Sequence, residues 1–465
     1  MTLSNYFNLK IEKSHLKAFF AIFILFLLPA VFRILDHNFQ KYFGLNKYVN
    51  VFDFIFIGTA AFFFIRKDQL KKYVSLNTSL IVLFICLSRM SIFFSDGEIH
   101  HKAFYDLFRA SLAMFLIFVF LTTYFRRNYE FVFKCFFMLF FIFAFFESIV
   151  GILQFILQRP LGLSFLNEPF FSINNSHSAK IYISENSLGI FSNIIHSKNG
   201  DYLRSHGTFL HPNVFAGFLN ISLILTMYQI HKSKKKIVFS IFLILQLVAL
   251  ILTFSRAGML AFVCSSFMFF ILMKIKKNDV KKMGLIFLTC SFVILCVFSK
   301  FILERGLLGS LFQSNKAKEL NCKSDNLRSS LSQVAKKMIK KNPVLGVGFR
   351  NFLIKKDEYS NQKLERAYVH NIYLLIASES GFLALMIFLL LLTSIIFNAV
   401  KYCINDLFII SICIIFSFLI IGFFDHYPIS SYFGKIVLFS NIAALNFLTE
   451  ISKPLSYSQK ACLYQ

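Results

Sequence analysis

Three arginines and one histidine stand where they could act on a phosphate-bearing substrate. Arg204, Arg256 and Arg328 lie in or beside polar segments that flank long apolar runs, and His370 directly precedes another such run. Arginine is always charged and binds phosphate oxygens bidentately, and histidine is the side chain best able to take a proton near neutral pH. These residue types suit group transfer from a diphosphate. The guanidinium groups would stabilise the departing diphosphate, and the imidazole would accept the proton of the incoming hydroxyl.

The composition is that of a membrane protein. The 465 residues are 57% hydrophobic and carry a formal net charge of +26, and the mean hydropathy is +0.65. Water-soluble domains are about half apolar and lack repeated runs long enough to cross a bilayer. Basic residues gather in short loops, so the charge indicates membrane orientation rather than nucleic-acid binding. The nine cysteines are scattered and predict neither a disulfide framework nor a CxxC metal site.

The apolar runs predict an all-α polytopic membrane protein with about twelve transmembrane helices. A run of roughly 17–25 apolar residues is long enough to cross the hydrocarbon core. The lysine-rich start of the chain is followed by no small-x-small cleavage site, so the first run is expected to be an uncleaved span. The predicted spans are 18–35, 49–65, 76–94, 104–125, 131–157, 212–230, 237–253, 257–273, 283–303, 371–399, 406–424 and 430–449.

Charge in the loops orients these helices. Four short basic loops fall on one side together with both termini, and the positive-inside rule makes that side cytoplasmic. They are 66–72, 126–134, 231–236 and 274–282. The four candidate residues fall on the opposite, external side, which also holds two long loops and the corners at 95–101, 253–256 and 425–427.

The chain therefore divides into five predicted parts. The second long loop should contain an amphipathic, interfacial helix that stops at Asn342-Pro343, because apolar residues recur at helical spacing at Leu327, Leu331, Val334 and Met338. The "GVGF" that follows predicts a tight glycine turn. The parts are helices one to five (1–157), the first large external loop (158–211), helices six to nine (212–303), the second large external loop (304–370), and helices ten to twelve with a cytoplasmic tail (371–465).

Two predicted helices have distinctive beginnings. Pro212 suits the first turn of a helix, and His211 and Asn213 are expected to cap or pack there rather than to react. His370 and Gly381 are eleven residues apart, about three helical turns, so they are expected to share one helix face. A glycine on that face would let another helix approach closely.

Four stretches on the external side resemble, in order, the signatures of the O-antigen ligase/polymerase superfamily of bacterial envelope proteins. They are "RSHGTFLHPNVFAGF", "LTFSRAGML", "NPVLGVGFRNF" and "HNIYLLIASESGF", between residues 204 and 382. The resemblance implies a glycosyltransferase of the bacterial inner membrane that works at the periplasmic face. It would move an undecaprenyl-diphosphate-linked glycan without a metal or other cofactor.

The resemblance also implies roles for individual residues. His370 would be the catalytic base, Arg256 and Arg204 would hold the diphosphate, and Arg328 would bind substrate or diphosphate. The supporting positions would be Asn371, Gly381, His211 and Asn213. The chain departs from one motif of the ligases, a basic residue followed four positions later by leucine. Only Lys323 and Leu327 have this spacing, because Arg328 is followed by a leucine three positions later, at Leu331.

The resemblance leaves the acceptor open. A ligase passes the glycan to lipid A–core in lipopolysaccharide biosynthesis, a polymerase passes it to another lipid-linked unit beside a possible chain-length regulator, and a third branch glycosylates protein side chains. Two readings of other classes are a polysaccharide transporter and a metal-dependent transferase that uses Asp36 of "LDHN". The clustering of polar groups at one face favours an enzyme over a transporter.

Overall fold

The computed structural model describes Leu80, Leu83, Phe84 and most of residues 140–452. Within the last range it leaves out 167, 176–177, 184–194, 196–199, 277–278, 306–314, 361–362, 366 and 403–405. The predicted spans 18–35, 49–65 and 104–125, most of 76–94, and Asp36 lie outside the described residues.

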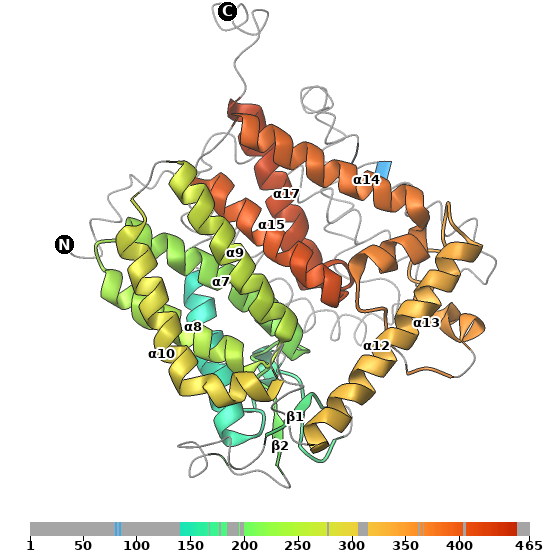
Figure 1. Ribbon diagram of the computed structural model, residues 1–465, viewed down its shortest axis with the longest axis horizontal. Coiled ribbons are helices and arrows are strands. Elements are labelled where there is room, and N and C mark those ends of the chain that lie inside the picture. The colour runs from blue at the N-terminus through green and yellow to red at the C-terminus, as the bar shows by residue number, and fades with distance from the viewer. Residues whose placement is uncertain are drawn as a thin grey trace, which may run out of the picture.

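The described part is built mainly from helices that coincide with predicted spans (Figure 1). They are the helix Phe140–Leu157, α7 (Pro212–Lys232), α8 (Lys236–Leu252), α9 (Arg256–Ile275), α10 (Lys281–Arg305), α14 (Ile372–Tyr402), α15 (Asp406–Phe424) and α17 (Tyr432–Ser452). Five of these are long and apolar enough to cross a membrane: Phe140–Leu157, Pro212–Lys232, Arg256–Ile275, Ile372–Asn398 and Asp406–Phe424. A mostly helical protein with several helices able to span a membrane is thus confirmed, while the count of twelve stays a prediction.

The first external loop departs from the all-α prediction. It contains a short antiparallel pair, β1 (Lys180–Tyr182) and β2 (Asp201–Leu203), in which Ile181 lies opposite Tyr202. Ile181 and Tyr202 are buried. Pairing the two segments satisfies the backbone groups of an extended chain, and their apolar side chains pack against the helices below. The fold is mostly helical, as predicted, and this short strand pair lies within a predicted loop.

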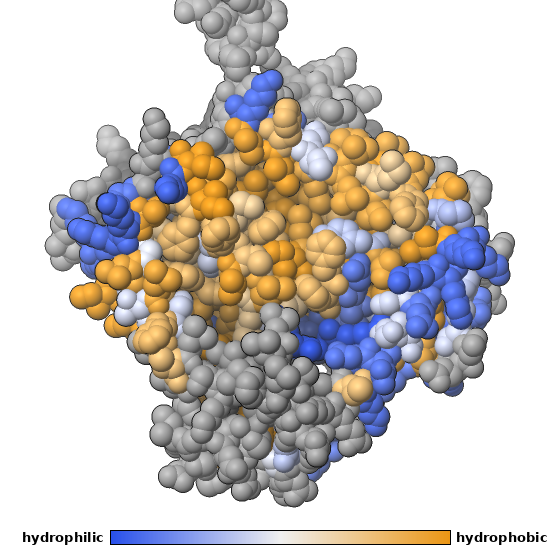
Figure 2. Space-filling model, viewed as in Figure 1, coloured by the Kyte–Doolittle hydropathy of each residue, from blue (hydrophilic) through white to orange (hydrophobic). Residues whose placement is uncertain are grey.

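The main core forms around α7. Sixteen of the 21 residues of α7 are buried, because α8, α9 and α15 pack against it. A helix that is covered on all sides needs apolar residues all round, which explains why α7 has no polar face. The outer helices instead expose apolar side chains, as at Phe267 of α9 and Met386 of α14, and Figure 2 shows a continuous hydrophobic surface over this part of the molecule.

The second external loop has a small core of its own. The helix α12 (Asn315–Lys341) buries Leu331, Val334 and Met338 against residues that include Phe352 and Val369. Its lysines at 336, 337, 340 and 341 are exposed, and hydrophilic side chains gather over this region in Figure 2. The predicted amphipathic helix and its stop before Asn342-Pro343 are confirmed, although the helix begins earlier than predicted. The loop continues through α13 (Phe352–Lys355) and the 3₁₀ turn η5 (Lys356–Tyr359). Another 3₁₀ turn, η3 (Ser164–Leu166), lies in the first long loop.

Gly381 breaks α14, and this overturns one prediction. Its backbone has φ 83° and ψ 171°, and His370 lies before the helix begins, so the two residues do not share a continuous helix face. The segment that packs closely against Gly381 is not a helix either. It is the backbone of residues 343–348, which contain the glycine turn, since a Cβ on Gly381 would lie 1.8 Å from the Val344 carbonyl oxygen.

The break joins the second loop to the membrane helices. The carbonyls of Ser378 and Glu379 accept hydrogen bonds from the N–H groups of Val347 (2.8 Å) and Gly348 (2.9 Å). The N–H of Phe382 donates to the Pro343 carbonyl at 2.8 Å. These bonds replace those that an unbroken helix would make internally. The predicted glycine turn is confirmed by the positive φ of Gly346 and Gly348.

An ionic cluster marks the other end of the helices. Asp406, which begins α15, pairs with Lys232 at the end of α7 (2.9 Å) and with Lys276 just after α9 (2.5 Å). The Tyr228 hydroxyl donates to the same carboxylate at 3.1 Å. A helix of 21 residues is about 31 Å long, so this basic end lies far from the start of α7.

Candidate functional site

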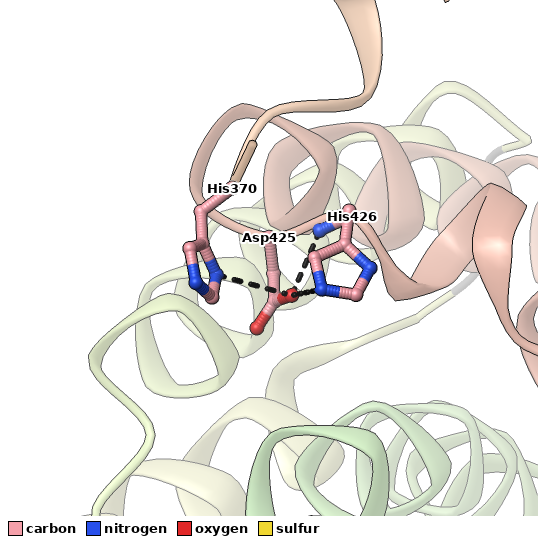
Figure 3. Close-up of side chains that lie close together, drawn as sticks. All are labelled: His370, Asp425 and His426. Atoms are coloured by element: carbon pink, nitrogen blue, oxygen red, sulfur yellow. Dashed lines mark hydrogen bonds and ion pairs between the residues drawn. The ribbon is translucent and has the colours of Figure 1, made fainter. Parts of the chain in front are cut away.

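His370, Asp425 and His426 lie together at the end of the helices opposite the basic cluster (Figure 3). His370 Nδ1 is 3.6 Å from Asp425 Oδ1, and His426 Nε2 is 4.0 Å from the same oxygen. The backbone N–H of His426 donates to Asp425 Oδ1 at 2.7 Å. The His370 side chain is 23% exposed and that of Asp425 only 7%. The Nδ1 of His370 is buried beside this carboxylate.

The antiparallel packing of α14 and α15 brings these residues together. The two helices are separated by three residues in the chain, so the end of α15 returns to the start of α14. Asn371 fixes the junction because its Oδ1 accepts from the Leu374 N–H (2.9 Å) and its Nδ2 donates to the Phe423 carbonyl (3.2 Å). The first contact is that of a helix N-cap. It makes Asn371 the residue that holds His370 against the end of α15.

Asn213 connects this cluster to Arg204. The Asn213 Nδ2 donates to Asp425 Oδ2 at 2.6 Å, and its Oδ1 accepts from the Arg204 guanidinium at 2.8 Å. The Arg204 Nε donates to the Thr253 carbonyl at 2.7 Å. Arg204 is 6% exposed and Asp425 5%, so this is a buried chain of bonds that runs from the α8–α9 corner to the histidine.

His211 has the capping role that was predicted for it. It is the N-cap of α7, and its Nδ1 accepts from the Asn213 N–H at 3.1 Å, with Pro212 at the first helical position. Asn213 was expected to cap or pack in the same way. Its side chain instead bridges Arg204 and Asp425, because the first turn of α7 points these atoms toward α15.

The segment that carries Arg204 is anchored to the helix Phe140–Leu157. Gln154 accepts from the His206 N–H at 3.1 Å and donates to the Gly207 carbonyl at 2.9 Å. Glu147 accepts from the backbone and the hydroxyl of Thr208 at 2.8 and 2.6 Å. Both side chains are buried, and they satisfy loop groups that face the helix bundle.

Burial and neighbouring charges set the ionisation of the cluster. Burial by itself raises the pKa of Asp425, but the close His370 and the charges of His426 and His211 outweigh it and hold that pKa well below its ordinary value. Burial lowers the pKa of His426 to about 4, against the attraction of Asp425. Burial, followed by the charge of Arg204, lowers the pKa of His211 to about 3. At neutral pH Asp425 is therefore a carboxylate, and His211 and His426 are neutral.

The other two arginines approach the site from different elements. Arg256 is the first residue of α9, and its guanidinium lies 3.1 Å from Asp325 Oδ1 of α12, with both side chains partly exposed. Arg328 lies one turn further along α12 and is close enough for its charge to lower the pKa of His426. Arg328 thus lies near the site on α12, and Arg256 is joined to the same helix through Asp325, whereas Arg204 is joined to the site through Asn213.

The loop charges predict that Asp425 and His426 lie on the external side, but the sequence predicts no role for either residue. They lie 55 and 56 positions after His370, and no spacing rule links a loop residue to the far end of the next helix pair. The sequence feature that could have pointed to Asp425 is the position of this acidic residue, in "DHY", at the end of an apolar run in a chain with only 23 acidic residues. An ionisable group at such a boundary is expensive unless it is paired.

The fold and the site define a polytopic membrane protein whose polar, buried network lies at one end of its helices. Residues 241–389 match the family described as O-antigen ligase, and this part of the chain holds Arg256, Arg328, His370 and Gly381. The match confirms the resemblance to the O-antigen ligase superfamily over that range. A search among curated proteins gives no match to the chain.

The bridge made by Asn213 predicts a large effect on stability. Asn213→Ala would leave Asp425 Oδ2 and the Arg204 guanidinium without this buried partner, and the free energy of unfolding is expected to fall by about 3 kcal/mol. The measurement is thermal unfolding of the purified protein in detergent. Asn398→Ala is the matched control, since Asn398 makes one long bond within α14 (3.5 Å) and its loss should change stability by less than about 0.5 kcal/mol. Equal unfolding temperatures for the two variants would contradict the bridging role.

Proposed function

We propose that this protein is a glycan ligase of the bacterial inner membrane. It transfers a glycan from an undecaprenyl-diphosphate carrier to a hydroxyl of lipid A–core at the periplasmic face. The observation that carries the proposal is the contact between His370 and the buried Asp425, to which Arg204 is joined through Asn213. His370 lies within the stretch that matches O-antigen ligase. The chemistry needs one base, several fixed cations and a lipid-facing surface, and these occur together here.

His370 acts as the general base. Asp425 favours the tautomer with hydrogen on Nδ1, so the lone pair lies on Nε2. The acceptor hydroxyl oxygen attacks the anomeric carbon of the donor sugar, and its proton passes to Nε2. The bond from that carbon to the diphosphate oxygen breaks, and the diphosphate leaves with the electron pair. A base of this kind contributes about 10²–10⁴-fold to the rate.

The arginines divide into two roles. Arg328, which is near His426 on α12, and Arg256, which pairs with Asp325 of the same helix, hold the diphosphate. Their guanidinium groups offset the charge of the leaving group. Arg204, which the resemblance also assigned to diphosphate binding, has its Nε and one terminal nitrogen bonded to Thr253 and Asn213. It therefore acts mainly as a positioning residue, through Asn213 and Asp425.

The orientation follows from the charges. The cluster of Lys232, Lys276 and Asp406 lies at the end of the helices away from His370, and basic ends of short loops face the cytoplasm. The site then faces the periplasm, and both termini are cytoplasmic. The two long loops, 158–211 and 304–370, then lie on the periplasmic side.

The proposal is tested on the surface polysaccharide of a strain that lacks the gene. We expect a lipid A–core band without its ladder, together with accumulated lipid-linked chains, and a restored ladder on complementation with the wild-type gene. Core that carries a single repeat unit would instead identify a polymerase. A normal ladder in the deletion strain would contradict both, and loss of a glycosylated protein would identify a transferase to protein side chains.

A further inference from the structure

The cluster of His370, Asp425 and His426 has the geometry of a metal site as well as of a catalytic pair. Each residue offers one ligand atom, and the three atoms lie within 4.8 Å of one another. Zinc bonds of 2.0–2.1 Å in a tetrahedron place neighbouring ligand atoms about 3.4 Å apart. The distances from Asp425 Oδ1 to His370 Nδ1 and His426 Nε2 are 3.6 and 4.0 Å, close to this value. The two imidazole nitrogens lie within 4.8 Å of each other and would move closer together around the ion.

The groups around the cluster hold each ligand in a suitable state. Ser430 Oγ lies 2.6 Å from His426 Nδ1, and when Nδ1–H donates to it, the lone pair of Nε2 faces Asp425. Asn213 engages Oδ2 of Asp425, which leaves Oδ1 as the oxygen that faces both imidazoles. Such outer contacts orient the ligands of known metal sites.

We propose that His370 Nδ1, Asp425 Oδ1 and His426 Nε2 bind one Zn²⁺ ion, and that the bound ion blocks His370 as a base. Two imidazoles and one carboxylate are ligands that Zn²⁺ accepts, and three protein ligands leave its fourth position open. The side chains of His370 and His426 are 23% and 25% exposed, so the ion can enter from the same side as substrate. The positive charge of Arg328 disfavours binding of the ion. The negative charge of the Asp425 carboxylate favours it.

The block follows from the tautomers of His370. Zn²⁺ at Nδ1 takes the lone pair of that atom, so the hydrogen of the neutral ring must lie on Nε2. Catalysis requires the opposite tautomer, with hydrogen on Nδ1 and the lone pair on Nε2. Metal binding and proton acceptance therefore exclude each other at one side chain. This blocking effect rests on the proposed function, whereas the binding of Zn²⁺ does not.

The first experiment measures binding without any assay of transfer. ZnCl₂ is titrated calorimetrically into the purified full-length protein in detergent, with wild type compared with His426→Gln, Ser430→Ala and His231→Gln. We expect one site that weakens at least about 100-fold in His426→Gln and about 10-fold in Ser430→Ala. His231 lies near the basic end of α7, so His231→Gln should leave the site intact. Equal titrations for wild type, His426→Gln and Ser430→Ala would overturn the proposal, and Ser430→Ala keeps the test valid if His426→Gln does not fold.

The second experiment adds ZnCl₂ to a reconstituted transfer reaction. We expect inhibition that a chelator reverses, with the inhibitory concentration raised about 10-fold for Ser430→Ala. Activation by Zn²⁺ would overturn the block and would favour a metal-dependent transferase. If the wild-type protein transfers no glycan, the proposed function fails, but the calorimetric result still decides whether the metal site exists.

Discussion

Replacing His370 with glutamine is expected to lower the rate of glycan transfer by about 100-fold or more, because general bases contribute roughly 10²–10⁴-fold. Glutamine keeps a polar side chain of similar length but cannot accept a proton at neutral pH. If His370 only anchored the start of α14, glutamine would serve almost as well. The measurement is kcat with a polyprenyl-diphosphate-linked donor and the reconstituted protein, at matched amounts of folded enzyme.

The matched control is the same substitution at the other end of the bundle. His231 is partly buried in the last turn of α7, and His231→Gln should leave kcat within about twofold of wild type. Asp425→Asn should follow His370→Gln, since it removes the carboxylate that favours hydrogen on Nδ1 and keeps nearly the same shape. A His370→Gln enzyme with wild-type kcat would exclude His370 as the base.

Replacing Gly381 with alanine is expected to destabilise the fold by about 3–5 kcal/mol. The backbone φ of 83° is unfavourable for any residue with a Cβ. The new Cβ would also lie 1.8 Å from the Val344 carbonyl oxygen and 2.6 Å from the Leu345 nitrogen. Both are backbone atoms, so the clash can be relieved only by moving the loop that joins α12 to α14.

Gly284→Ala is the control for this change. Gly284 lies in α10, and the nearest atom to its added Cβ is a Phe270 ring carbon at 3.8 Å, an ordinary contact. Alanine in a helix lowers the entropy of the unfolded chain, so this variant should be as stable as wild type or up to about 1 kcal/mol more stable. Thermal unfolding in detergent distinguishes them. Equal unfolding temperatures for the two variants would show that the junction at Gly381 can open without loss of stability.

The sequence by itself determined the local features of this protein. Long apolar runs predicted helices at 212–230, 257–273 and 406–424, and the structure has α7, α9 and α15 there. Transfer of apolar side chains into lipid depends on composition along one segment, so it can be read without knowing any neighbour. The end of α12 before Asn342-Pro343 was equally local, because proline cannot continue a helix and restricts the residue before it.

Only the tertiary structure decided which residues meet. Asp425 contacts His370 because α14 and α15 pack antiparallel with matched ends, and Asn213 reaches both Arg204 and Asp425 because α7 starts beside them. The helix break at Gly381 was missed for the same reason. The glycine itself permits a continued helix, and it is the backbone of residues 343–348 that supplies the hydrogen bonds for the broken form. Periodicity describes one element at a time, whereas these contacts depend on how several elements pack together.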